Sequence, residues 1–268
     1  MNKNYKIVLL IAIFIVFTPI HAQLMEDKNI PTLLRENPVD SHLLKLVSAL
    51  SEQAHFSKKK VTNELSPFIL INFLEKLDPV KMYFTRSDIR YFQRYRFKID
   101  DALEQGNLET IYDIFRIYRL RVQQRLGFSL KTLLNYNKNF ESDSSYDFNN
   151  NSKNWLEDIE QLESLWQKKT YNDLLTLILA GQTKEIATDV LEKRYKRFVK
   201  KINLFNEEDV ISIFLNAYAH TLDPHSNYLN PTQSEEYEIQ MSLSYQGIGA
   251  RLNLTDEQVQ VVNIILNS

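Results

Sequence analysis

Residues 106–127, GNLETIYDIFRIYRLRVQQRLG, carry the clearest structural signal in the sequence. Apolar side chains recur every three or four positions over 108–126, which is the period of one face of an α-helix. This stripe contains Ile111, Ile114, Phe115, Tyr118 and Val122. Gly106-Asn107 is expected to stop a preceding helix and cap this one, and Gly127 is expected to follow its end. The stretch therefore predicts a long amphipathic helix.

The same helical period extends on both sides, from about residue 30 to residue 240. Ser66-Pro67 predicts an N-cap followed by a first helical residue, and Thr85 with Asp88 fits a short capping box. Further helices are expected from Ser41 to Leu50, Trp155 to Trp166, Tyr171 to Leu179, Lys184 to Leu204 and Asn206 to Thr221. Because no repeat of about 34 or 40 residues is visible, a regular solenoid is not expected.

Two segments depart from the helical pattern. Residues 135–154 are rich in Asn, Ser and Asp and predict a long surface loop between two helical halves, with a mobile lid as the functional alternative. After residue 240, alternating apolar residues around Thr255-Asp256-Glu257 predict a β-hairpin. The expected fold class is mainly α, with a helical N-terminal domain over 23–240 followed by a truncated β segment over 241–268.

The composition excludes several classes of function. With 32 basic and 34 acidic residues, the chain has no large field for steering nucleic acid, which is not expected as a partner. Cysteine is absent, which excludes disulfides, thiolate metal sites, a cysteine nucleophile and a bacterial lipoprotein anchor. No H-E-x-x-H, G-x-S-x-G or P-loop pattern is present, so neither these catalytic motifs nor any cofactor is expected.

The first 22 residues have the order of a secretory signal peptide. Lys3 and Lys6 precede an apolar run of 11 residues, 7–17, and Ala22 stands at the expected cleavage position. An uncleaved membrane anchor is the alternative, but the run is shorter than the roughly 20 residues that span a bilayer. An exported chain without disulfides is expected in a Gram-negative periplasm, with membrane contact only through the signal peptide.

Two clusters of polar residues could be read as catalytic or metal sites. Ser57 and Lys60 satisfy S-x-x-K, the spacing of one class of serine acylases, but a catalytic lysine must be desolvated and three consecutive lysines indicate a solvated helix end. His220, Asp223 and His225 lie close in sequence, but a metal site needs three or four converging ligands. Pro224 forces Asp223 out of helical geometry, so a helix end followed by an Asp-Pro turn is the simpler interpretation.

Residues 193–201, KRYKRFVKK, interleave basic and aromatic side chains. That pattern could be a nucleic-acid strip. At helical spacing, however, the apolar residues gather on one face and the lysines and arginines on the other. A solvated amphipathic helix face is the simpler account.

Gly247-Ile248-Gly249, just before the first predicted strand, forms the most informative small motif. Such a turn can point successive backbone N–H groups into one concavity that binds a terminal carboxylate. The following strand edge could then accept the peptide as an added strand. A simple tight turn is the alternative.

Seven segments together carry a family resemblance: Leu77-Asp78-Pro79, Tyr83-Phe84, Ser87-Asp88-Ile89, DALEQGNL at 101–108, LESLW at 162–166, DPHSNYL at 223–229 and MSLSYQGIGA at 241–250. In order and spacing, over about residues 40–255, they resemble the N-terminal domain of tail-specific proteases, also called carboxy-terminal processing proteases. The family usually has Thr in place of Ser226 and Glu in place of Gln246.

The resemblance implies a helical domain followed by a PDZ domain and a protease core with a serine–lysine dyad. It implies that Gly247, Ile248 and Gly249 form the carboxylate-binding loop of the PDZ domain. Members are periplasmic and cleave proteins selected by apolar C-terminal residues, and their helical domain encloses substrate and can dock an outer-membrane lipoprotein adaptor. The chain is expected to end within the first part of the PDZ domain, so no residue of it receives a catalytic or metal-binding role.

Three hypotheses follow from the sequence. The chain is the N-terminal part of a tail-specific protease, which recruits and shelters substrate but lacks the cutting core. Alternatively, it is a stand-alone periplasmic binding or adaptor protein that holds a partner and a peptide terminus. The third hypothesis is a truncated remnant without activity, whose unpaired apolar strand would mark it for degradation.

Overall fold

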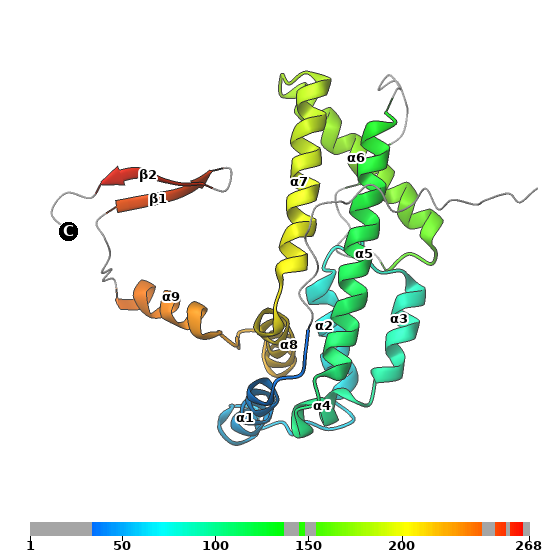
Figure 1. The fold of residues 1–268 in the computed structure, drawn as a ribbon. Coiled ribbons are helices and arrows are strands. Elements are labelled where there is room, and N and C mark those ends of the chain that lie inside the picture. Colours follow the sequence, from blue (N-terminus) through cyan, green and yellow to red (C-terminus); the bar gives the residue numbers. More distant parts are fainter. Residues whose placement is uncertain (1–33, 137–144, 148–153, 243–249, 256–257, 265–268) are drawn as a thin grey trace, which may run out of the picture. The chain divides into compact units, whose positions relative to one another are not determined.

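The structure is a computed structural model that describes residues 34–136, 145–147, 154–242, 250–255 and 258–264 (Figure 1). The described part is mainly helical, as the sequence predicts. Its helices are α1 (Pro38–Ala54), α2 (Ser66–Leu77), α3 (Arg86–Phe92), the 3₁₀ turn η1 (Gln93–Tyr95), α4 (Ile99–Gln105), α5 (Glu109–Leu134), α6 (Ile159–Leu179), α7 (Lys184–Leu204), α8 (Glu207–Leu222) and α9 (Pro231–Ser242). The strands are β1 (Ala250–Thr255) and β2 (Gln258–Ile264).

The helices from α1 to α8 pack around one core. Helix α5 packs against both α6 and α7, which also contact each other, and α2 packs against α8. The predicted α5 stripe is buried throughout, from Ile111 to Val122. At the α2–α8 contact the rings of Phe73 and Phe214 meet edge to face, with their centroids 5.4 Å apart, a favoured geometry for buried aromatic pairs.

Several helix ends follow from local sequence chemistry. The capping box at Thr85 and Asp88 is confirmed, and Asn206 with Asp209 forms a second one at the start of α8. Gly106 ends α4 with a left-handed backbone at φ 69°, a conformation that glycine adopts without a Cβ clash. These helix ends confirm the capping box predicted at Thr85 and Asp88 and the helix stop predicted at Gly106.

The prediction that Ser66 caps the helix that it begins is wrong. Helix α2 begins at Ser66, with Leu65 in the capping position and no side-chain cap. The Ser66 hydroxyl instead accepts hydrogen bonds from the backbone N–H groups of Ile99 (3.1 Å) and Asp100 (3.3 Å) at the start of α4. A serine hydroxyl can satisfy orphan N–H groups of any helix that packs within reach, so tertiary contact decided which helix it caps.

Two predicted boundaries on either side of residues 135–154 are also wrong. Helix α5 passes through Gly127 and continues to Leu134, because Ser129 and Leu133 on its next turns are buried. The two predicted helices at 155–166 and 171–179 form the single helix α6, which starts only at Ile159. Within the predicted loop, the described residues 135–136, 145–147 and 154 carry neither helix nor strand.

Gly127 provides a direct test of the α5 geometry. A Cβ added there meets nothing within 4 Å, whereas glycine in a helix interior costs about 1 kcal/mol relative to alanine. Gly127→Ala is therefore expected to raise the free energy of unfolding by about 0.5–1 kcal/mol. Urea unfolding followed by circular dichroism measures the change. A loss of stability would show that the helix does not run through this position.

The predicted hairpin is confirmed. Strands β1 and β2 pair antiparallel, from Ala250 opposite Ile264 to Thr255 opposite Gln258, with an irregularity between Arg251 and Leu252. The hairpin agrees with the predicted β segment, while its assignment to a PDZ domain stays a prediction. Among the described residues, every helix is either too short or too polar to cross a membrane.

Candidate functional site

The predicted carboxylate-binding loop, Gly247-Ile248-Gly249, lies outside the described residues. Its role stays a prediction. The structure describes the chain again from Ala250, where β1 begins.

The S-x-x-K pair does not form a dyad. Ser57 and Lys60 both lie beyond the end of α1. The Ser57 hydroxyl is hydrogen-bonded to the Nδ1 atom of His55 (2.8 Å), and Lys60 is exposed. Since a lysine base must be desolvated, this arrangement does not activate Ser57.

The basic stretch at 193–201 is a solvated face of α7. Tyr195 and Val199 are buried, whereas Arg194 and Arg197 are exposed. Lys196 pairs with Glu192 one turn earlier, at 2.8 Å. The amphipathic interpretation is confirmed, and the nucleic-acid alternative gains no support from the geometry.

His220, Asp223 and His225 do not converge on a metal. Asp223 caps the end of α8, the Nδ1 atom of His225 lies 3.4 Å from its carboxylate, and His220 is hydrogen-bonded to Asn227 (2.9 Å). Nowhere in the described ranges do three or more His, Asp or Glu side chains form a group able to hold a metal ion. The helix end followed by an Asp-Pro turn is the correct interpretation.

The same segment is held firmly to the helical core, and we call residues 223–228 the strap. Asn216 on α8 clamps the backbone of Tyr228 from both sides: its Nδ2 donates to the Tyr228 carbonyl (2.9 Å) and its Oδ1 accepts from the Tyr228 N–H (3.1 Å). The Ser226 hydroxyl donates to Asp223 (3.2 Å) and is hydrogen-bonded to the Nε2 atom of His55 (3.0 Å). The strap therefore joins the end of α1 to the point where the chain leaves α8.

A buried carboxylate organises the turn after α2. Asp78 is 0% exposed and accepts from the backbone N–H groups of Met82 (2.8 Å), Tyr83 (3.0 Å) and Phe84 (3.0 Å), and from Trp155 Nε1 (3.1 Å). Burial raises the pKa of Asp78, and these donors oppose the rise. Four donors converging on one carboxylate fix the path of residues 78–84.

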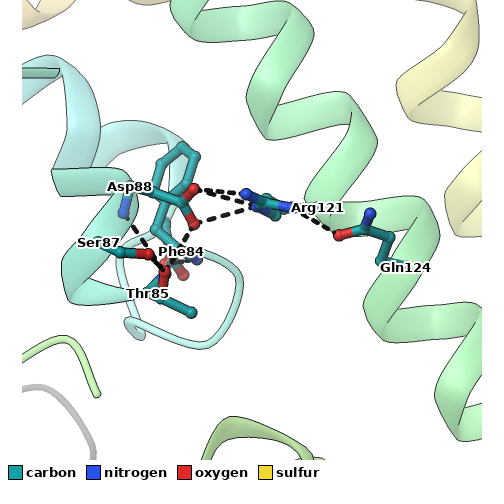
Figure 2. A network of polar contacts seen from close by, with 7 residues as sticks. Phe84, Thr85, Ser87, Asp88, Arg121 and Gln124 are labelled. Carbon is teal, nitrogen blue, oxygen red and sulfur yellow. Dashed lines mark hydrogen bonds and ion pairs between the residues drawn. The ribbon is translucent and has the colours of Figure 1, made fainter. Parts of the chain in front are cut away.

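Beside this turn, a charged network joins α3 to α5 (Figure 2). The guanidinium of Arg121 makes a two-pronged contact with Asp88, with Nη2 donating to Oδ1 (2.6 Å) and Nε to Oδ2 (3.0 Å). Asp88 also accepts from the Thr85 N–H (3.0 Å), and Arg121 donates to Gln124 (2.8 Å). The charge of Arg121 is thus compensated within the fold.

Sequence reasoning missed Arg125, one turn beyond Arg121. It is 3% exposed, and its Nε and Nη1 atoms are buried without a hydrogen-bond acceptor. The sequence did carry a signal for the burial of Arg125, because position 125 continues the apolar stripe that contains Tyr118 and Val122. An arginine on a buried stripe requires a partner, and Arg125 lines an open cleft of about 750 Å³.

Comparisons with known proteins identify the family of this chain. The family described as "Tail specific protease N-terminal domain" matches residues 46–232, which include most of α1, all of α2 to α8 and the strap. The "Tail-specific protease" of Haemophilus influenzae is 25% identical over 240 residues, which cover 89% of this chain. The chain spans about a third of that relative, 34% of its length. On this evidence, the chain belongs to the tail-specific protease family and contains its N-terminal domain.

Proposed function

We propose that this chain is the N-terminal portion of a periplasmic tail-specific serine protease and serves to recruit and enclose protein substrates. The substrates are proteins with apolar C-termini. We assign peptide-bond cleavage to a serine–lysine dyad in the family's protease core, and none of residues 1–268 is assigned to that dyad. The proposal includes export through residues 1–22 and docking of an outer-membrane lipoprotein adaptor.

The observation that carries the proposal is the family match over 46–232. The strap supports it. Its hydrogen bonds to Asn216 and His55 fix the point at which the chain turns from α8 toward α9 and the hairpin. A binding segment placed after the strap would therefore leave the helical domain from a defined position. We assign Gly247, Ile248 and Gly249 to the recognition of the substrate C-terminal carboxylate.

A binding measurement tests the recruiting role. The probe is an unfolded, fluorescein-labelled reporter protein that ends in Leu-Ala-Ala, compared with the same protein ending in Asp-Asp-Asp. Fluorescence anisotropy with the purified chain is expected to show binding of the apolar tail. The acidic tail is expected to bind at least about tenfold more weakly. Equal affinity for both tails would contradict the proposal.

Two controls separate the parts of the proposal. Gly249→Val is expected to abolish the preference for the apolar tail while leaving the helical circular dichroism spectrum unchanged. Osmotic-shock fractionation, with detection by an antibody against the helical domain, tests export. Recovery of the protein only with cytoplasmic markers would contradict the periplasmic assignment without affecting the binding result.

A further inference from the structure

An apolar hollow lies on the surface where the start of α2 meets the turn that precedes α4. It has a volume of about 560 Å³, within the usual range of sites that bind small ligands. Its apolar walls are Pro67, Phe68 and Ile71 from α2 and Phe97 from the turn, and we call it the aromatic groove. Phe68 and Phe97 are 62% and 55% exposed. The fold therefore leaves two aromatic rings of one hollow largely in water.

Buried anchors beneath the groove hold its two sides together. Helix α2 turns residues 69, 70, 73 and 74 toward the core, which leaves Phe68 on its outer face. The buried Ser66 hydroxyl accepts hydrogen bonds from the N–H groups of Ile99 and Asp100, which holds the start of α4 beside the start of α2. Phe97, two residues before Ile99, is thereby brought to the side of Phe68. The groove is thus formed before any ligand arrives.

A cation stands at the edge of the groove. Arg96 lines it, and the guanidinium carbon of Arg96 lies 5.0 Å from the centre of the Phe97 ring. Within the part of the chain that the structure describes, no acidic side chain forms an ion pair with Arg96, nor with the exposed Arg94 and Lys98 on either side of it. Glu64 also lines the groove. The groove therefore combines apolar walls with an unpaired cation beside one of its rings.

This combination discriminates between the occupants that an exposed apolar patch can have. A flat membrane surface does not fill a hollow. A second copy of this chain, in a symmetric contact of this patch with itself, would bring Arg94, Arg96 and Lys98 against the same cations of its partner. A peptide fits both features, because its apolar side chains enter the hollow while an acidic side chain beside them pairs with Arg96.

We propose that the aromatic groove binds an extended, unfolded segment of a protein chain. Apolar side chains of the segment lie between Phe68 and Phe97, and an Asp or Glu side chain pairs with Arg96. This site is separate from residues 247–249 and needs no terminal carboxylate, so it holds internal segments. The inference rests on the proposed function, because the ligand is a segment of the protein substrates that the domain encloses. A hold on an internal segment keeps a substrate in place once its tail has been recognised.

A peptide that is blocked at both ends tests the assignment. The probe is acetyl-Gly-Leu-Leu-Asp-Leu-Gly-amide, the Leu peptide, which offers no terminal carboxylate to residues 247–249. Broadening of its leucine methyl NMR signals on titration with the whole chain measures binding. Replacing the three leucines by serine is expected to weaken binding at least about tenfold, and replacing Asp by Asn about threefold, the size of an exposed ion pair. Equal binding of the Leu and Ser peptides, or no binding of the Leu peptide at about 10 mM, overturns the proposal.

A variant of an exposed ring locates the site. Phe97→Ser is expected to weaken binding of the Leu peptide at least about tenfold. Leu179→Ser at the end of α6 is the matched control, because Leu179 is 78% exposed and does not line the groove. This control should leave binding unchanged, and circular dichroism checks that both variants fold. Undiminished binding by Phe97→Ser, or an equal loss in the two variants, contradicts the assignment.

Variants of charged residues test the ion pair independently of the rings. Arg96→Gln should bind the Asp and Asn peptides equally, because the partner of the Asp side chain is gone. Arg197→Gln on the exposed face of α7 should keep the threefold difference. Glu64→Gln should strengthen binding of the Asp peptide, since it removes a like charge from the groove. If the Asp peptide still binds about threefold better than the Asn peptide to Arg96→Gln, the pairing with Arg96 is wrong.

The two probes distinguish failure of this proposal from failure of the recruiting function. If the reporter proteins show a tail preference but the blocked Leu peptide does not bind, only the groove assignment fails. If the Leu peptide binds and Phe97→Ser weakens it, while the reporters show no tail preference, the recruiting function fails and the groove remains a peptide site. Sedimentation with phosphatidylglycerol vesicles, or dimerisation of the chain, that Phe97→Ser abolishes would assign the patch to a membrane or a second copy and overturn the proposal.

Discussion

Asp78→Ala is expected to lower the free energy of unfolding by about 4 kcal/mol, a large effect for a single substitution. The carboxylate accepts four N–H donors, and alanine leaves all four buried without an acceptor. Each unsatisfied buried donor costs about 1–3 kcal/mol before relaxation. For a chain of this size, the midpoint of thermal unfolding should fall by about 10 °C. Calorimetry and urea unfolding measure the two quantities.

Two matched variants make this result specific. Asp78→Asn keeps an oxygen for most of the donors, so it should cost about half as much as alanine. Glu104→Ala on α4 removes an exposed acid and should change stability by less than about 0.5 kcal/mol. If Asp78→Ala were as mild as Glu104→Ala, the convergence of donors on Asp78 would not stabilise the turn.

Gly106→Ala is expected to lower the free energy of unfolding by about 3 kcal/mol. Two costs add. A left-handed backbone costs a residue with a Cβ about 1–2 kcal/mol, and Gly106 has φ 69°. The added Cβ would also clash with the Ser41 carbonyl oxygen in α1. Because the obstacle is backbone, α1 must shift away from α4, which exposes part of the core.

Gly181→Ala separates the two costs. Gly181 also has a left-handed backbone, at φ 92°, but a Cβ there meets nothing within 4 Å. Its substitution should therefore cost only the backbone term, about 1–2 kcal/mol. Equal losses in the two variants would show that α1 and α4 do not approach each other closely at Gly106. Urea unfolding of both variants under the same conditions gives the comparison.

The local features of the fold could be predicted from the sequence because they depend on neighbouring residues. The α5 stripe, the Thr85–Asp88 capping box, the stop at Gly106 and the bounds of α7 all arise from contacts within a few residues. The hairpin also belongs to this group, since alternation and a polar turn determine it. The family resemblance could likewise be recognised from the order of short segments, and the match over 46–232 confirms it.

The C-terminal ends of helices could not be predicted from neighbouring residues alone. A glycine predicts the end of a helix only when no tertiary contact favours further helical turns. At Gly127 the helix continues, because Ser129 and Leu133 on the following turns are buried. The cost of about 1 kcal/mol for glycine in a helix is small beside the burial of a leucine, about 1.5–3 kcal/mol. The same reason joined the two predicted helices into α6, whose Leu162, Trp166 and Leu174 are all buried.

The sequence by itself determined the helical class, most helix starts and the family. Only the tertiary structure decided which distant groups are paired. In the folded chain the Ser66 hydroxyl accepts a hydrogen bond from the start of α4, Asp78 accepts one from Trp155, and His55 is hydrogen-bonded to Ser226. Asp88 forms its ion pair with Arg121 and not with Arg125. Helix propensity and capping act over a few residues, whereas hydrogen bonds and charges act over a few ångströms in space. Separation along the sequence therefore predicts helices and their caps, but it does not predict which distant side chains form hydrogen bonds or ion pairs.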